Sequence, residues 1–297
     1  MPAPFLSSLC GYREGRPNTS DKNDKGSIEL GTIFYEKIGI SPHATPPVKA
    51  VGNLMAELMS TDLQESFQVD APHLVVEPER SFTSFEQFSH LNAARELRGD
   101  MAAGVVRTVN AIRNFSRMTG VEQSLQHQLN EHLDNLQDEV RSTEDRRREL
   151  LDLLGEESLL KLDITVSREM SNPTNPSSSL QHLVAGLSLK WTLRTDRAQD
   201  CRSQGSKMAA LRRGRMPHFA AVTMEPRPAM LALLGRGSGD IDCVYHLHLP
   251  ALAAAIDEYC SGTQSKARQG IRDNFKRLRD QRRVRDYDEL RDYVATL

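Results

Sequence analysis

The alternation of apolar and polar residues predicts strands at several places in the chain. In the stretch LVAGLSLK, residues 183–190, four apolar residues fall on one face, and Ser188 and Lys190 fall on the other. Trp191 and Thr192 extend this pattern, because aromatic and β-branched residues favour strands. Shorter patterns of the same kind predict strands at residues 73–76, 159–166, 218–224 and 241–246.

Apolar residues spaced three or four apart predict helices, most strongly at residues 121–154. This helix has its apolar positions between Leu125 and Val140. It either pairs with a partner helix in a coiled coil or lies on the core of its own domain, and its few heptads favour the second arrangement. Weaker patterns predict helices at residues 28–38, 52–63, 84–91, 101–118, 196–211 and 251–259, and in the tail from residue 264.

The period changes at Thr195 and Asp196, directly after the strand that carries Lys190. Asp196 with Gln199 approximates a capping box, which predicts a helix start at this point. A strand end followed by a helix start is a common site of chemistry in α/β proteins.

Interleaved strands and helices predict an α/β fold with a single domain. We divide its residues 1–297 into a helical part at 1–155, a core at 156–260 and a basic helical tail at 261–297.

Charge is unevenly distributed along this chain of 297 residues, whose net charge is −2. Residues 1–187 carry 18 Lys and Arg against 27 Asp and Glu, a balance of −9, whereas residues 188–297 carry 20 against 13, a balance of +7. A local basic excess is typical of a contact with a polyanion, although the near-neutral total argues against a chain coated in positive charge. The excess is densest at Arg202, Lys207, Arg212, Arg213 and Arg215.

The four cysteines are scattered and form no CxxC pair, so we expect reduced thiols. No apolar run approaches the roughly 18 residues of a membrane span, and the N-terminus does not resemble a signal peptide. We therefore expect a cytoplasmic protein that does not bind a membrane.

GRGSG at residues 235–239 lacks the GK[ST] sequence of a phosphate-binding loop, so we expect no nucleotide cofactor.

One group of residues near the end of the predicted strand at 241–246 has the residue types of a zinc site, but we do not expect it to bind a metal. Cys243, His246 and His248 lie on or beside one short strand, and three ligands so placed do not surround a metal ion. We expect these histidines to belong to the core.

The candidate chemistry lies in Asp163 and Lys190, because neighbouring strands would place the carboxylate beside the ammonium. Hydrolysis of a phosphodiester uses such a pair: a carboxylate holds Mg²⁺, which neutralises phosphate charge and acidifies a bound water. The lysine then orients that water and stabilises charge on the phosphoryl oxygens. From spacing alone, a partly buried salt bridge remains the alternative interpretation.

Three motifs that follow one another along the chain resemble the NgoMIV family of type II restriction endonucleases. They are SLKWTLRTDRAQDCRSQG, RRGRMPHFAAVTMEPRP and GSGDIDCVYH. The resemblance is close over residues 183–256, continues weakly to Asp163, and is poor over the first 150 residues and the basic tail. It implies a PD-(D/E)XK nuclease core with a central mixed β-sheet flanked by helices. It also implies Mg²⁺-dependent cleavage of both DNA strands, leaving 5′-phosphate ends. The implied assembly is a homotetramer, a dimer of dimers, bound to palindromes with CCGG at the centre and GCCGGC as the candidate site.

The family's catalytic pattern is carried over position by position. Asp163 matches the metal-binding aspartate, although Leu162 stands in place of the usual proline. Ser188 and Lys190 match the S-x-K form of the second motif, in which serine replaces an acid. The resemblance therefore assigns Asp163, Ser188 and Lys190 to catalysis.

The family's recognition element R-x-D-R is matched by Arg194, Asp196 and Arg197. Arginine reaches O6 and N7 of guanine through two hydrogen bonds, and aspartate accepts from N4 of cytosine. These residue types suit a site rich in guanine and cytosine. The alternative role for the three residues is an ion-paired helix start.

Two departures from the family pattern affect the expected site. The family has a glutamate on the helix after the lysine, where this chain has Gln204, and Asp200 stands one turn earlier where the family has an amide. We expect Asp200 and Gln204 to share the catalytic role, with Asp163, Leu189 and Asp200 as the Mg²⁺ ligands. The arginine expected to contact the outer base pair aligns with Met230, and Arg227 is the candidate substitute.

The expected function is thus site-specific cleavage of double-stranded DNA. A sequence-specific DNA-binding protein with a weakened nuclease site is the first alternative, because Gln204 is neutral. A helical interaction protein that uses residues 121–154 and the tail is the second.

Overall fold

The computed structural model describes residues 3–92, 102–119, 122–154, 161–171, 179–236, 239–261 and 265–297. The chain divides into two compact units. The first unit comprises Met1–Phe88 and Lys161–Leu297, and the second comprises Ser89–Leu160.

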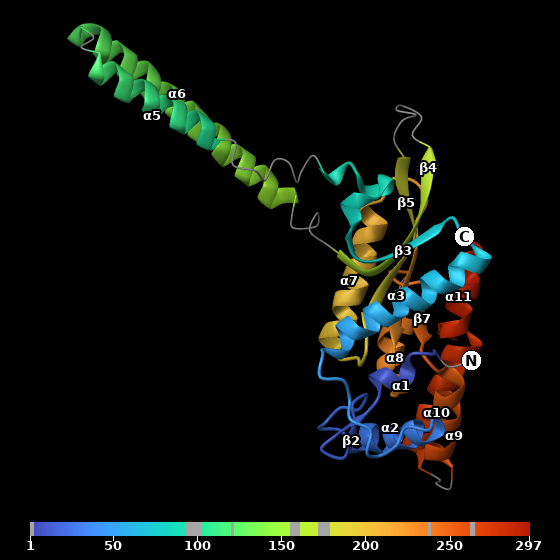
Figure 1. Cartoon of the computed structure of the whole chain (residues 1–297). Helices are drawn as coiled ribbons and strands as arrows, with labels where there is room; N and C mark the ends of the chain where they lie inside the picture. Colours follow the sequence, from blue (N-terminus) through green and yellow to red (C-terminus); the bar gives the residue numbers. More distant parts are fainter. Residues whose placement is uncertain are drawn as a thin grey trace. The chain divides into compact units, whose positions relative to one another are not determined.

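The first unit is built on a sheet of six described strands in the order β3-β4-β5-β6-β7-β8 (Figure 1). β3, β4 and β5 pair antiparallel, whereas β5 to β8 pair parallel, so the sheet is mixed. The predicted α/β class with a central mixed sheet flanked by helices is therefore confirmed. The strands are β3 Leu74–Ser81, β4 Lys161–Ser171, β5 Ser179–Lys190, β6 His218–Thr223, β7 Cys243–His246 and β8 Val284–Asp286.

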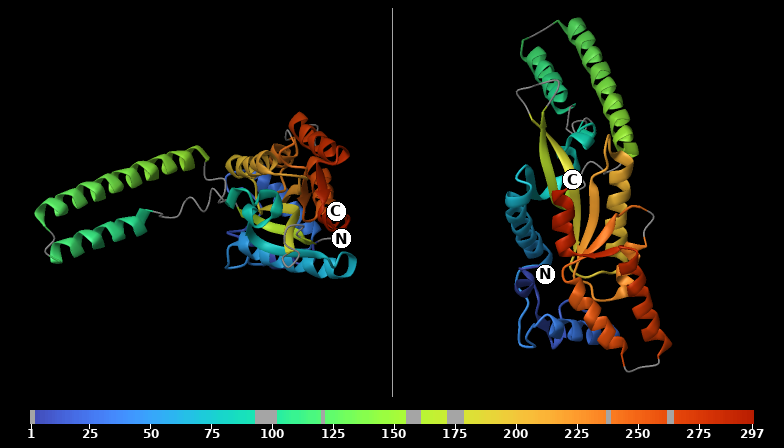
Figure 2. Two further views of the ribbon diagram at one scale, coloured as in Figure 1. Left: turned by 90° about the horizontal axis from the view of Figure 1, so that it is seen from above. Right: turned by 90° about the vertical axis from the view of Figure 1, so that its right-hand side faces the viewer.

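Helices cover both faces of this sheet, and Figure 2 shows α3 and α7 on opposite sides of it. A Cβ atom added to Gly205 of α7 would collide with the main-chain oxygen of Asp240 and the ring of Phe219, so glycine permits the close approach of α7 to the sheet. The helices of this unit are α1 Leu6–Leu9, α2 Lys25–Lys37, α3 Val51–Asp70, α7 Thr195–Leu211, α8 Pro228–Gly235, α9 Leu249–Cys260, α10 Lys266–Asp280 and α11 Tyr287–Ala295. No described helix has both the length and the apolarity needed to cross a membrane.

The central strands are apolar because both of their faces are covered. All six residues of β6 are buried, as expected for a strand in the parallel part of a sheet. All four cysteines are free and buried. His246 is buried, which confirms that it belongs to the core, whereas His248 is only half-buried and caps the N-terminus of α9.

Several element boundaries differ from those predicted from the sequence. The predicted strand at 73–76 continues through Pro78, because β3 lies at the edge of the sheet, where a missing N–H is tolerated. The predicted helix at 84–91 is replaced by two 3₁₀ turns, η1 Phe82–Ser84 and η2 Glu86–Phe88. α8 was not predicted, and the tail contributes β8 to the sheet. The first residues contain a short hairpin of β1 Tyr12–Arg13 and β2 Arg16–Pro17.

The predicted capping box at Asp196 is wrong. α7 begins at Thr195 with Arg194 as its N-cap residue, and no side chain caps it. Asp196 lies in the first turn instead, where its carboxylate interacts favourably with the helix dipole.

The second unit is a pair of helices, α5 Ala102–Met118 and α6 Gln123–Leu154, that lie along each other (Figure 1). Arg113 of α5 forms an ion pair with Asp134 of α6 and donates to Gln137 Oε1 at 3.1 Å. α6 therefore has a partner helix within its own unit.

Candidate active site

Asp163 and Lys190 are neighbours at one end of the β4–β5 pair. The Nζ atom of Lys190 lies 3.8 Å from Oδ2 of Asp163. The main-chain N–H of Leu189 donates to the same oxygen at 2.6 Å, and Ser188 Oγ donates to it at 3.5 Å. The antiparallel register, in which Ile164 pairs with Leu187, brings these predicted residues together.

The Asp163–Lys190 pair is open to solvent on the carboxylate side. The side chain of Asp163 is 41% exposed and that of Lys190 is 22% exposed. Ion pairs of this exposure typically stabilise a fold by only about 0–1 kcal/mol. The Asp163–Lys190 pair therefore contributes little to the stability of the fold. Because it is exposed, a reacting group has access to it.

A thiol that the sequence analysis missed lies behind this pair. Cys201 of α7 is buried and shares a hydrogen bond with Ser188. Burial raises the pKa of the Cys201 thiol to about 11, although the Ser188 hydrogen bond and the charge of Lys190 act in the opposite direction. The thiol is neutral at pH 7 and serves as packing beneath Ser188.

Asp200 and Gln204 of α7, which we expected to share the catalytic role, lie in different surroundings. Asp200 is exposed and lines the same cleft as Lys190. Gln204 donates from Nε2 to the main-chain oxygen of Lys161 at 2.6 Å, at the start of β4. Asp200 is therefore available to a ligand in the cleft, whereas the amide of Gln204 holds a strand end.

A cleft of about 720 Å³ surrounds the end of β5. Of the predicted site residues, it brings together Leu189, Lys190, Arg194, Arg197, Asp200 and Arg227. Three further cations, Arg13, Arg16 and Lys22, come from the N-terminal segment. Trp191 Nε1 donates to the main-chain oxygen of Asn18 at 3.2 Å and so ties that segment to the end of β5. The cleft is basic, as a site for a polyanion requires.

The predicted recognition residues lie at the start of α7. Arg194 and Arg197 are exposed and line the cleft, whereas Asp196 is exposed without lining it. Arg197 Nη1 donates to the main-chain oxygen of Thr192 at 3.3 Å and to Thr192 Oγ1 at 3.2 Å. These contacts hold the guanidinium of Arg197 beside the strand–helix junction.

Arg227 is engaged by carboxylates. Its Nε donates to Glu225 Oε1 at 2.6 Å, and its Nη1 lies 3.4 Å from Asp21 and 3.7 Å from Asp24. A role in contacting the outer base pair would require the guanidinium to leave these partners. That role stays a prediction.

Glu225 is a buried carboxyl group beside the cleft that the sequence analysis missed. Its side chain is completely buried, and Oε2 accepts a hydrogen bond from the N–H of Leu193 at 2.8 Å. Burial raises the pKa of Glu225, while its hydrogen bonds with Arg227 partly oppose this shift. Glu225 follows directly after β6 in the sequence MEPRP, which has the composition of a turn, so no local pattern marks it.

The donor set at the end of β5 fits a magnesium ion. Mg²⁺ keeps several waters and uses one or two carboxylates, and the candidates are Asp163, beside Lys190, and Asp200, which lines the cleft with Lys190. The contacts of Asp163 described above all involve Oδ2, so Oδ1 has no hydrogen-bond partner among the described residues. No group of three His, Cys, Asp or Glu that could hold a metal occurs within the described residues, so water would have to complete the coordination.

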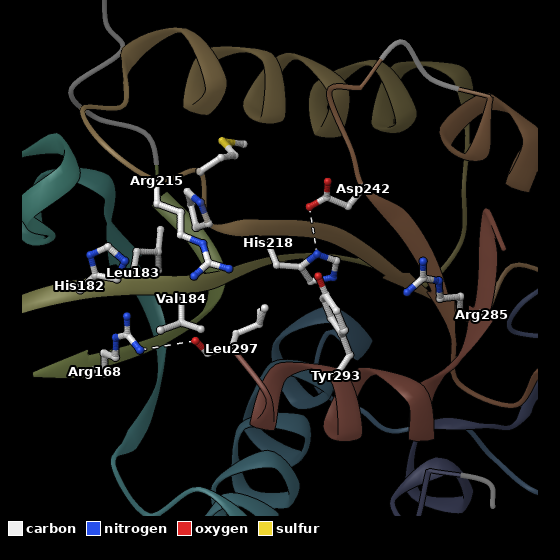
Figure 3. Close-up of a pocket in the computed structure, with 12 residues that line it drawn as sticks. Arg168, His182, Leu183, Val184, Arg215, His218, Asp242, Arg285, Tyr293 and Leu297 are labelled. Carbon is white, nitrogen blue, oxygen red and sulfur yellow. Dashed lines mark hydrogen bonds and ion pairs between the residues drawn. The ribbon is translucent and has the colours of Figure 1, made fainter.

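A second cavity, of about 370 Å³, lies at the other end of the parallel strands (Figure 3). His218 at the start of β6 contacts Asp242 Oδ2 through Nδ1 at 2.9 Å, and Arg168 donates to the main-chain oxygen of Leu297 at 3.4 Å. Arg215, from the basic cluster noted in the sequence, also lines it. Lys190 pairs with Thr223 at the opposite end of β6, so this cavity is separate from the candidate active site.

Comparisons with known proteins bear on the part of the chain that carries most of this site. Residues 170–291 match the family model described as NgoMIV restriction enzyme. The chain is 38% identical over 108 residues to the type II restriction enzyme NgoMIV of Neisseria gonorrhoeae. The aligned part is 36% of this chain and 35% of that enzyme, so the chain spans about a third of the length of the curated relative it matches. The resemblance noted in the sequence is confirmed for this region, and Asp163 lies before it.

Proposed function

We propose that this chain, whose residues 170–291 match the NgoMIV restriction enzyme family, is a type II restriction endonuclease that cleaves both strands of DNA. The observation that supports this most is the position of Lys190, which lies 3.8 Å from Asp163 at the edge of a basic cleft. The cations of this cleft come from both the N-terminal segment and α7. A DNA backbone that enters the cleft would therefore contact positive charge from both.

In this proposal Asp163, Leu189 and Asp200 hold Mg²⁺, the two aspartates through their carboxylates. The bound ion would neutralise phosphate charge and acidify a water molecule. Lys190 orients the attacking water and donates hydrogen bonds to the phosphoryl oxygens as their charge grows. Ser188 and the N–H of Leu189 hold the Asp163 carboxylate in place through Oδ2. Gln204 contributes by fixing the start of β4.

The proposed recognition site is a palindrome with CCGG at its centre, and GCCGGC is the specific candidate. Arg194 and Arg197 would each donate two hydrogen bonds to guanine, and Asp196 would accept from cytosine. Both arginines line the cleft that contains Lys190, so recognition and cleavage would occur on one face of the duplex. We further propose that the enzyme acts in the cytoplasm as a homotetramer, a dimer of dimers, that binds two copies of the site.

A plasmid digest with and without Mg²⁺ tests this function. A linear product that forms only when Mg²⁺ is present supports the endonuclease. Specific binding of CCGG duplexes without any cleavage would instead indicate a DNA-binding protein with a weakened nuclease site. Absence of DNA binding at low salt would favour a helical interaction protein and would contradict the proposal.

A further inference from the structure

The cavity at the far end of the parallel strands is lined by three arginines. They are Arg168 of β4, Arg215 of the segment between α7 and β6, and Arg285 of β8 (Figure 3). These residues lie far apart in the chain, so the fold, and no local pattern, brings them together. None of them lines the cleft around Lys190. We call this cavity of about 370 Å³ the arginine cavity.

The three guanidinium groups have no acidic side chain as a partner. Arg168 donates to the main-chain oxygen of Leu297 at 3.4 Å, and Arg285 Nε donates to that of Arg282 at 3.1 Å. Among the described residues, no Asp or Glu forms an ion pair with Arg168, Arg215 or Arg285. Like charges that share a cavity repel each other, and partly buried charges are screened less than exposed ones. An anion in the cavity would relieve this repulsion.

Asp242 is the one acidic side chain among the described residues that line the cavity, and other groups already hold it. Its Oδ2 lies 2.9 Å from His218 Nδ1 and accepts from the N–H of Phe219 at 2.9 Å. His218 Nε2 lies 3.2 Å from the hydroxyl oxygen of Tyr245, so both nitrogens of this ring are engaged. Three cations thus share the cavity with one carboxylate, and positive charge remains in excess even when a terminal carboxylate at Leu297 is added.

Hydrogen bonds hold the walls of the arginine cavity in place. Gln87 is completely buried, and its side chain donates to the main-chain oxygen of Leu183 at 2.8 Å and accepts from the Leu183 N–H at 3.0 Å. The main-chain oxygen of Gln87 accepts from the N–H of Arg213 at 2.8 Å, which fixes the segment that leads to Arg215. Arg168 is held by the pairing of β4 with β5. A preformed site of this kind avoids much of the entropy cost of ordering its walls when a ligand binds.

We propose that the arginine cavity binds the phosphate group of a small phosphate ester. Guanidinium groups donate paired hydrogen bonds in a geometry that matches phosphate oxygens. The volume of about 370 Å³ falls in the range of small-molecule sites, about 300–1,000 Å³, and leaves room for more than the phosphate itself. The exposed ring of Tyr293 on the same lining offers apolar area to the rest of the ligand. This inference goes beyond the proposed function and does not depend on cleavage.

The test titrates the full-length chain with inorganic phosphate, with chloride at equal ionic strength as the control salt. Calorimetry measures the affinity, and thermal unfolding measures the stabilisation that a ligand of the folded state confers. The variant is Arg215→Gln, whose exposed side chain can be replaced without disturbing the core, and the matched control is Arg277→Gln, an exposed arginine of α10 outside the cavity.

We expect the wild-type chain and Arg277→Gln to bind phosphate equally, and Arg215→Gln to bind it at least tenfold more weakly. Without phosphate, Arg215→Gln should unfold at no lower temperature than the wild-type chain, because one of three repelling charges is gone. Arg168→Gln, on the opposite wall, should repeat the loss of affinity. Absence of saturable phosphate binding to the wild-type chain, or wild-type affinity in Arg215→Gln, would overturn the proposal.

Two further measurements exclude other sources of the signal. The basic cleft could itself bind phosphate, so Arg194→Gln is titrated in parallel, and loss of binding in that variant alone would overturn the proposal. A DNA backbone offers the same phosphate chemistry, so binding of a scrambled duplex is also compared. We expect equal DNA affinity for the wild-type chain and Arg215→Gln, whereas weaker DNA binding by Arg215→Gln would overturn the assignment to a small ligand. Plasmid cleavage reports on the proposed nuclease separately.

Discussion

Glu225 and Arg227 hold the peptide groups on both sides of Leu193. The Leu193 N–H donates to Glu225 Oε2 at 2.8 Å, and Arg227 Nη2 donates to the Leu193 main-chain oxygen at 2.9 Å. Leu193 lies between Lys190, at the end of β5, and Arg194, at the start of α7. This ion pair, of which Glu225 is buried and Arg227 partly exposed, therefore fixes the junction between the proposed catalytic and recognition residues.

Replacing Glu225 by Gln should weaken the fold measurably. The amide retains an acceptor for Leu193 but removes the charge that faces Arg227. Because Arg227 keeps Asp21 and Asp24 as partners, the loss is that of hydrogen bonds to a charged group, and we expect the free energy of unfolding to fall by about 1.5–3 kcal/mol. Denaturant unfolding measures this. The exposed Glu65→Gln should change it by less than about 0.5 kcal/mol. Equal effects of the two substitutions would show that the pair does not stabilise the junction.

The sequence predicted the elements that position Asp163 and Lys190, because strand alternation is a local pattern. It also located the start of α7 to within one residue. It missed Arg13, Arg16 and Glu225, since their place in the cleft depends on contacts between segments far apart in the chain. The N-terminal segment resembles an irregular loop, and nothing local indicates that Trp191 ties it to β5.

Removal of Arg194 or Arg197 should relax sequence discrimination. If each arginine reads a guanine, alanine at either position should cost about 1–3 kcal/mol of preference for CCGG over a mismatched duplex. Competition binding with matched and scrambled duplexes gives this value. Arg212→Ala, which removes an exposed basic residue at the far end of α7, is the control for lost phosphate contacts. An unchanged ratio of affinities would assign both arginines to the phosphate backbone or to structure.

Asp200 should supply the second carboxylate of the proposed Mg²⁺ site in place of Gln204. We expect Asp200→Asn nearly to abolish cleavage, because a single carboxylate compensates poorly for dehydrating Mg²⁺. Adding Gln204→Glu should restore much of the rate, since residues four apart on a helix present neighbouring side chains. Gln204→Glu alone separates this rescue from loss of the Lys161 contact. Normal cleavage by Asp200→Asn would show that the second carboxylate comes from elsewhere, with Glu57 as the next candidate.

His246 should make the fold sensitive to acid. Burial lowers its pKa from 6.5 to about 3, so the unfolded chain binds a proton at a pH where the folded chain does not. The neutral, buried His246 therefore contributes a stability that is fully present above pH 6.5. This contribution is lost as the pH falls toward 3, at up to about 1.4 kcal/mol per pH unit. His246→Asn, which keeps an acceptor for the N–H of His248, should reduce that slope. An identical pH dependence of unfolding in both proteins would refute this assignment.

The most direct test of the proposed nuclease compares the wild-type chain with Lys190→Ala on a plasmid that contains one GCCGGC site. With Mg²⁺, the wild-type chain should cut both strands within that site and leave 5′-phosphate ends, as sequencing of the product ends will show. Lys190→Ala should bind the same duplex with unchanged preference while its cleavage rate falls by ~10³ or more, because the ammonium acts on the developing phosphoryl charge. Wild-type protein that leaves the plasmid intact with Mg²⁺, or Lys190→Ala that cuts at the wild-type rate, would contradict the account.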